Sequence, residues 1–160
     1  MDVLQRLIPT GTQAMKRYAG GDRIQAVERE MLTRGKKYIL GCGSFLSVHE
    51  LAKRFDVQAE LLAPALAEWV ADHRIFEIEH DGCSLFPSYA FSGDAGISPQ
   101  SGLREVIAIL SQMKDGWAMS FWFISPNGLL GGRRPQGLLS IDPQAVALAA
   151  RDEVKGFTQG

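Results

Sequence analysis

Apolar and polar residues along the chain repeat mostly at helical spacing. Residues 22–34, "DRIQAVEREMLTR", place four apolar side chains on one stripe of a helix whose remaining surface is charged. The stripe consists of Ile24, Val27, Met31 and Leu32. Gly35 is expected to end this helix, and "GCGS" at 41–44 is expected to be a loop. Residues 1–43 are therefore predicted to form an N-terminal helical segment.

The clearest local helix signal begins at Ser47. Ser47 can cap a helix, and Glu50, three residues later, can complete a capping box. A second apolar pattern at helical spacing follows over residues 58–70 and is disturbed by Pro64, which removes a hydrogen bond and kinks a helix. A helix, a short turn and a second helix form the helix-turn-helix layout.

Strand-like alternation follows over residues 74–87. It runs on both sides of Asp81-Gly82, a pair that suits a tight hairpin turn. Two helices followed by a hairpin predict a small helix-turn-helix or winged-helix-like lobe over residues 44–91. The "SGDAG" stretch at 92–96 is the expected domain boundary.

The rest of the chain predicts a compact helical bundle over residues 97–155. Ser98-Pro99 suits the cap and first position of one helix, and Asp142-Pro143 suits the start of another. Between them, "WAMSFWFI" is expected to form a helix that ends before Pro126. Residues 156–160 are expected to be a flexible tail. The predicted fold class is mainly α, with a small helix-turn-helix or winged lobe that contains one β-hairpin, followed by the bundle.

The composition of the chain argues against several classes of function. The chain has 160 residues, 46% of them hydrophobic, and a net charge of -1, so no global charge draws it to nucleic acid or lipid. Cys42 and Cys83 are the only cysteines, and the three histidines lack ligand spacing, so we expect neither a metal nor another cofactor. No apolar run is long enough for a membrane span, which favours a cytoplasmic protein. No motif in the sequence places a nucleophile beside a general base, so an enzyme is the least favoured class of protein.

The helix-turn-helix lobe raises the alternative of a DNA-binding transcriptional regulator. Its second helix would read the major groove, yet residues 58–70 contain no Lys or Arg and carry Glu60 and Glu68. The candidate DNA-binding residues lie elsewhere, and they are Lys36, Lys37, Lys53 and Arg54. The fold signal thus favours DNA binding and the charge signal opposes it.

A tightly punctuated stretch, "SPNGLLGGRRPQGLL", occupies residues 125–139. Its Gly and Pro residues suit turns, and its arginines could cap helix ends or lie in water. Arg133 and Arg134 could instead contact a partner, because the forked guanidinium is enriched at interface centres.

Three segments resemble a known family. "FPSYAFSGDAGISP", "LREVIAIL" and "FWFISPNGLLGGRRPQGLLSIDPQAVALAA" resemble the carboxy-terminal toxin-binding domain of the Xre/MbcA/ParS antitoxins, over residues 86–154. The shared features include a Trp-led helix that ends in Pro-Asn, a Leu-Gly corner, an Arg-Pro pair and a Val/Ala helix. The resemblance implies that the protein neutralises a RES-domain toxin, which degrades NAD, by packing against the entrance to the toxin's active site.

The resemblance also implies which residues bind the partner. The implied motif positions are Trp122, Pro126, Asn127, Leu130, Gly131, Arg134, Pro135 and Leu139. Of these, Trp122, Pro126, Asn127, Leu130, Arg134 and Pro135 are candidate partner-binding residues, together with Arg133. Phe157 in the tail is a further candidate, because it could reach into a toxin cleft. A homodimer is implied as well. The chain departs from the family in its acidic second helix and in Ala90, which stands where the family often has a polar residue.

Overall fold

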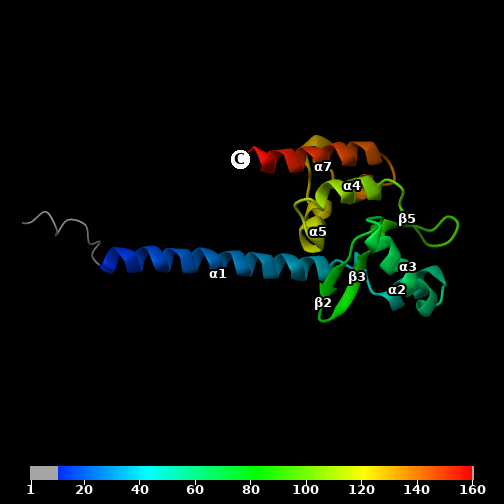
Figure 1. The fold of residues 1–160 in the computed structure, drawn as a ribbon, viewed down its shortest axis with the longest axis horizontal. Coiled ribbons are helices and arrows are strands. Elements are labelled where there is room, and N and C mark those ends of the chain that lie inside the picture. Colours follow the sequence, from blue (N-terminus) through cyan, green and yellow to red (C-terminus); the bar gives the residue numbers. More distant parts are fainter. Residues whose placement is uncertain (1–10, 160) are drawn as a thin grey trace, which may run out of the picture. The chain divides into compact units, whose positions relative to one another are not determined.

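The computed structural model describes the backbone of residues 11–159 and the side chains of residues 21–159. The chain divides into two compact units, residues 1–38 and residues 39–160. The described part of the first unit is helical, and the second unit combines helices with short antiparallel strands (Figure 1). The predicted mainly α fold is confirmed.

Helix α1 (Gly11–Gly41) is longer than its sequence pattern predicts. It continues through Gly35, so the expected stop there is wrong. A glycine inside a helix costs only about 1 kcal/mol relative to alanine, and Gly35 does not adopt the left-handed conformation that ends a helix. From residue 21 to residue 38 no side chain is buried, and Ile39 is the first core residue.

The second unit begins with the arrangement of a winged helix, in which two helices lie between the strands of a small sheet. The sheet is antiparallel with the order β1-β3-β2. Its elements in chain order are β1 (Phe45–Leu46), α2 (Val48–Phe55), α3 (Ala59–Ala71), β2 (Ile78–His80) and β3 (Cys83–Pro87). The predicted helix-turn-helix and hairpin are therefore both present.

Local sequence signals place these elements as predicted. The amide of Glu50 donates to Ser47 Oγ at 3.3 Å, and the amide of Ser47 donates to Glu50 Oε2 at 2.8 Å, which forms the capping box of α2. Asp81 and Gly82 both have positive φ, 50° and 73°, as a type I′ hairpin turn requires. Pro64 lies inside α3. Proline has no backbone N–H to donate, yet the helix continues to Ala71.

The following elements form a helical bundle. They are η1 (Ser88–Ala90), β4 (Phe91–Ser92), β5 (Ser98–Pro99), α4 (Leu103–Leu110), α5 (Gly116–Ile124), η2 (Gly128–Leu130), α6 (Pro135–Leu138) and α7 (Pro143–Thr158). Helices α4 and α7 run side by side (Figure 1). The predicted helix at "WAMSFWFI", ending before Pro126, and the predicted start of α7 at Asp142-Pro143 are confirmed. Asp142 Oδ1 accepts from the amide of Ala145 at 3.0 Å.

Two predictions for this bundle are wrong. Ser98-Pro99 does not begin a helix, because both residues pair with β4 and the amide of Gln100 then donates to the carbonyl of Ala90 at 2.8 Å. The segment expected as a flexible tail is helical as far as Thr158. Helix α7 is held at this end because Lys114 forms an ion pair with Glu153 at 2.9 Å and also lies 5.2 Å from the ring of Phe157.

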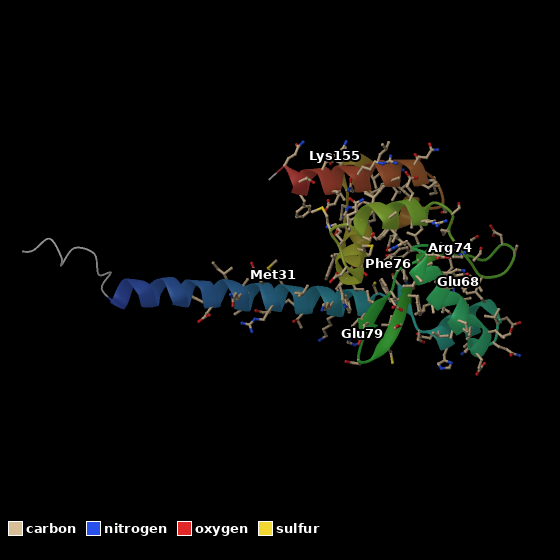
Figure 2. All side chains as sticks on the ribbon, in the orientation of Figure 1. Met31, Glu68, Arg74, Phe76, Glu79 and Lys155 are labelled. Atoms are coloured by element: carbon tan, nitrogen blue, oxygen red, sulfur yellow. The ribbon has the colours of Figure 1, made fainter. Side chains whose placement is uncertain are left out.

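Aromatic rings join the winged lobe to the helical bundle. Phe123 of α5 stacks on Phe76 at a centroid distance of 5.7 Å, and its ring centroid lies 5.4 Å from that of Tyr89 (Phe76 is labelled in Figure 2). Gly116 at the start of α5 approaches the Glu77 backbone so closely that a Cβ would lie 2.0 Å from the Glu77 oxygen. Residues 44–91 and 97–155, which the sequence suggested as separate domains, therefore share one hydrophobic core.

No helix in the described part of the chain combines the length and the apolar content needed to cross a bilayer.

Candidate partner-binding site

The stretch between α5 and α6 folds into a closed corner. Asn127 organises it, because its side-chain oxygen accepts from the amide of Leu129 at 3.0 Å and its carbonyl accepts from the amide of Gly132 at 2.9 Å. The amide of Asn127 in turn donates to the carbonyl of Arg133 at 3.1 Å. These backbone bonds join the two ends of the corner, residues 127 and 133.

The backbone conformation of the corner explains why two of its residues are glycines. Gly131 and Gly132 have φ values of 64° and 79°, in the left-handed region that other residues adopt only at a cost. Pro135 then fixes φ at the first position of α6 and is buried. Because both ends are fixed in this way, the corner presents its side chains on a rigid backbone.

Arg133 and Arg134 are exposed on this corner. The Nε of Arg133 donates to the carbonyl of Leu130 at 3.1 Å, and neither arginine forms an ion pair with any residue in the range 21–159. Leu129 and Ile141 are exposed close to them in sequence. The corner thus combines guanidinium groups with apolar side chains in water, the composition that interface centres favour.

A shallow hollow of about 410 Å³ lies on the α6 side of the corner. Arg133, Arg134 and Ile141 line it together with Gln136, whose side-chain oxygen is buried and has no hydrogen-bond donor within the described part of the chain. Buried polar atoms normally have a partner. The hollow therefore has a free acceptor beside two cationic side chains.

A second cleft, of about 380 Å³, lies on the α5 side of the same corner. Trp122, Pro126 and Asn127 line it, with the ion pair of Lys114 and Glu153 at its edge. Trp122 is only 7% exposed, and its indole N–H finds no acceptor among the residues that the structure describes. Because Asn127 lines this cleft and also bonds to Arg133, the two hollows flank one corner.

The residues implied by the antitoxin resemblance thus divide into two groups. Pro126, Asn127, Arg133 and Arg134 lie at the corner and its clefts. Leu130, Pro135 and Trp122, which were expected to bind a partner, are buried. Leu130 and Pro135 shape the corner from beneath, and Trp122 lines the cleft on the α5 side. Phe157 is exposed, but it projects from α7 and not from a loose tail.

Sequence reasoning missed four residues of this site. Leu129 and Ile141 resemble core positions in apolar runs, and no periodicity separates them from their buried neighbours. Lys114 and Glu153 are far apart in sequence, and only the packing of the bundle brings them together.

The candidate DNA-binding residues fall in both units. Lys53 and Arg54 are exposed in the last turn of α2, and the guanidinium of Arg54 lies 5.8 Å from the centre of the Phe55 ring. Lys36 and Lys37 belong to α1. Helix α3 has no basic side chain to offer.

The exposed side chains of α3 include Glu60, Leu61 and Glu68 (Glu68 is labelled in Figure 2). A helix that reads the major groove normally presents basic or amide side chains.

Among the described residues, Glu50 and Tyr89 have displaced pKa values, and neither lies at the corner. The hydrogen bonds from Ser47 lower the pKa of Glu50. Burial raises the pKa of Tyr89 well above its usual value. Within the described residues, no three His, Cys, Asp or Glu side chains form a group that could hold a metal ion.

No family model, no curated protein and no solved structure matches the chain.

Proposed function

We propose that the protein is a protein-binding module of the antitoxin type, which neutralises a RES-domain, NAD-degrading toxin by occluding the toxin's active site. The observation that supports this proposal most is the closed corner at residues 127–133, which presents Arg133, and Arg134 directly after it, in water without an ion pair to any residue in the range 21–159. In this role the protein acts in the cytoplasm and needs no catalytic residue or cofactor of its own.

Rigidity and composition both favour recognition by this corner. A loop that is already ordered loses little conformational freedom on binding, so more of the contact energy becomes affinity. Each guanidinium offers a forked set of donors that matches a carboxylate of the partner. The exposed side chains of Leu129 and Ile141 add apolar surface, whose removal from water is favourable.

The two flanking hollows offer further contacts. A carbonyl of the partner could accept from the indole N–H of Trp122, and a donor of the partner could satisfy the side-chain oxygen of Gln136. Each bond would remove the cost of a buried polar atom that lacks a partner, about 1–3 kcal/mol.

The test is capture of the partner with matched charge reversals. The tagged full chain is expressed in its native host, and co-purifying proteins are identified by mass spectrometry and assayed for NAD consumption. We expect an NAD-degrading protein to co-purify with the native chain and to be lost with the double change Arg133→Glu and Arg134→Glu. The double change Lys53→Glu and Arg54→Glu reverses the same number of exposed charges elsewhere and should retain it.

Two outcomes would refute the proposal. One is that no NAD-degrading protein is captured, and the other is that the two double variants capture it equally well.

A second candidate function is DNA binding, which the winged-helix order of the strands and helices favours. The same two double variants separate the candidates. DNA binding through α2 predicts that Lys53→Glu with Arg54→Glu abolishes the anisotropy change of a labelled duplex. The affinity of the native chain for the duplex should also fall steeply as salt rises. The acidic surface of α3 opposes this candidate, because it would face phosphate.

A further inference from the structure

Helix α1 carries a stripe of exposed apolar side chains. Four side chains on it, Ile24, Val27, Met31 and Tyr38, are each between 55% and 67% exposed. They occupy positions i, i+3, i+7 and i+14, which lie on one narrow face of a helix. In the heptad notation abcdefg these positions are a, d, a and a (Met31 is labelled in Figure 2).

The described side chains of α1 before residue 39 are not buried. The helix is 31 residues long, and helices in proteins are stabilised mainly by packing of an apolar face. Leu32, which the sequence pattern grouped with this stripe, falls at position b, to one side of it. The four positions at a and d form a narrow seam like that of a coiled coil, narrower than the face that a helix turns toward a globular core.

We propose that α1 associates with α1 of a second copy of this chain to form a parallel, two-stranded coiled coil. In a parallel pair, a residue at position g faces the residue at position e of the next heptad on the other helix. Arg23 occupies g and Glu28 occupies the following e, so the pair brings opposite charges together twice. Neither Arg23 nor Glu28 forms an ion pair with another residue in the range 21–159.

An antiparallel pair fits these charges less well. It brings position g near position g of the other helix, and with the apolar stripes aligned it sets Arg23 near Lys37 of the second copy. Like charges that face each other across an interface are destabilising. The charge pattern therefore selects the parallel orientation and a partner of identical sequence.

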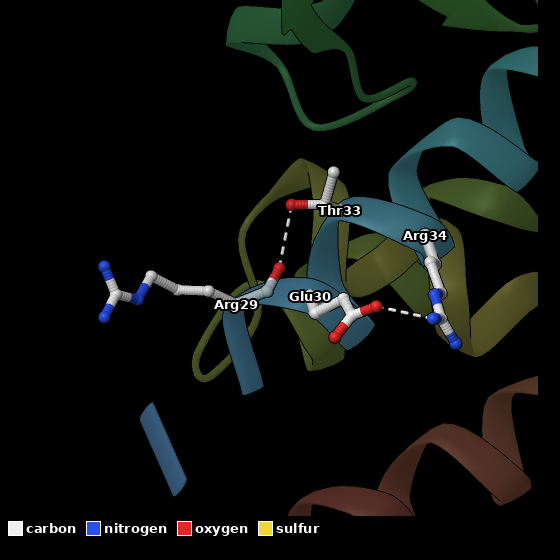
Figure 3. A network of polar contacts seen from close by, with 4 residues as sticks. All are labelled: Arg29, Glu30, Thr33 and Arg34. Carbon is white, nitrogen blue, oxygen red and sulfur yellow. Dashed lines mark hydrogen bonds and ion pairs between the residues drawn. The ribbon is translucent and has the colours of Figure 1, made fainter. Parts of the chain in front are cut away.

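Arg34 is the weak position of the seam. It occupies position d, which is normally hydrophobic in a coiled coil. Its guanidinium forms an ion pair with Glu30 of the same helix at 2.5 Å. Figure 3 shows this pair beside the bond from the Thr33 hydroxyl to the carbonyl of Arg29. Residues 24–38 span only about 21 Å of helix, at a rise of about 1.5 Å per residue. We therefore expect a micromolar dissociation constant.

The first test measures self-association of the full chain by sedimentation equilibrium over a range of micromolar concentrations. We expect Met31→Glu to weaken the dimer by about tenfold or more, and Arg34→Leu to tighten it by about tenfold. Leu32→Glu is the matched control, because Leu32 is also exposed but lies outside the seam, and it should leave the dissociation constant unchanged. All of these side chains are exposed, so the unfolding midpoint of residues 39–160 should stay constant.

The second test addresses orientation. Arg23→Glu and Glu28→Arg should each weaken association several-fold, and the two changes together should restore it, as a double-mutant cycle reports. In a background with Cys42→Ser and Cys83→Ser, Ile24→Cys should form an intermolecular disulfide, because a parallel pair places the two copies of residue 24 face to face.

Several results would overturn the proposal. They are a monomer at all concentrations, a dimer that Met31→Glu leaves intact, and a loss with Leu32→Glu as large as that with Met31→Glu. Absence of the disulfide together with failure of the charge exchange to restore association would overturn the parallel orientation. None of these measurements involves a toxin, so the proposed function can fail or hold independently.

Discussion

Helices α1 and α4 carry apolar residues at similar spacing, but only α4 buries them. Leu103, Val106 and Ile107 of α4 are buried against the rest of the bundle, whereas Ile24 and Met31 of α1 are more than half exposed. An amphipathic pattern shows that a helix has a face to cover. It does not show whether the same chain or another molecule covers that face.

The two helices also differ in what flanks them. Helix α4 lies along α7, where a Cβ on Gly102 would come within 2.3 Å of Pro143, and an ion pair joins Glu105 to Arg151. Along residues 21–38, Arg34 and Glu30 form an ion pair within α1, and no side chain is buried. Substitution of exposed side chains in this range should therefore change the stability of the monomer little.

The largest contrast is expected between Phe123→Ala and Ile24→Ala. Removing the fully buried ring of Phe123 should lower the free energy of unfolding by about 3–5 kcal/mol, since it leaves a cavity between Phe76 and Tyr89. Ile24→Ala should change it by less than about 0.5 kcal/mol at concentrations where the chain is monomeric. Urea denaturation followed by fluorescence measures both, and equal losses would contradict the contrast.

A smaller loss is expected for Gly116→Ala, which tests the contact between the winged lobe and the bundle. The new methyl group would clash with the backbone oxygen of Glu77, and the adjustment should cost about 1–3 kcal/mol. Gly128→Ala is the control, because a Cβ there meets no atom within 4 Å. Thermal unfolding midpoints that fall equally for both variants would show that the close approach is unimportant.

Ser47→Ala should cost about 1 kcal/mol, because it removes the side-chain cap of α2. The difference should also depend on pH. The backbone amide of Ser47, which the variant keeps, and then its hydroxyl, which the variant loses, lower the pKa of Glu50 in the folded state. The contribution of the hydroxyl therefore stabilises the fold above the unfolded pKa of about 4.3 and is lost as pH falls through the folded pKa. Denaturation at pH 7 and at acidic pH measures this, and a difference that stays constant would argue against the role of Glu50.

The smallest effect, and a stabilising one, is expected for Tyr89→Phe. The Tyr89 hydroxyl is buried without a partner in the described part of the chain, so its removal should stabilise the fold by up to about 1 kcal/mol. Burial raises the pKa of Tyr89, so the native fold should lose stability as pH rises above the unfolded pKa of about 10. Tyr89→Phe should reduce this alkaline loss, and an unchanged loss would mean that other groups cause it.

Local signals in the sequence predicted the elements whose causes are local. The cap at Ser47, the turn at Asp81-Gly82 and the helix start at Asp142-Pro143 each depend on atoms within a few residues of one another. The prediction of a helix start at Ser98-Pro99 was wrong because these residues pair with strand β4 instead. That strand becomes adjacent only after the chain folds back.

The candidate site was predictable in the same partial way. Arg133 and Arg134 stood out because Gly and Pro residues surround them, and the corner does present them in water. The burial of Leu130 and the exposure of Leu129, one residue apart, depend on how the short helix η2 rests on the bundle. No repeat in the sequence encodes that contact.

The ring of Phe123 has a practical consequence for anyone who shortens this protein. A fragment that stops before α5 would lack Phe123, which packs against Phe76 and Tyr89. A fragment that starts at residue 97 would lack Phe76 and Tyr89 and would expose Phe123 to water. Either piece would be prone to aggregate. The segment that resembles a toxin-binding domain should therefore be expressed or fused to another protein only together with the winged lobe, which covers its apolar surface.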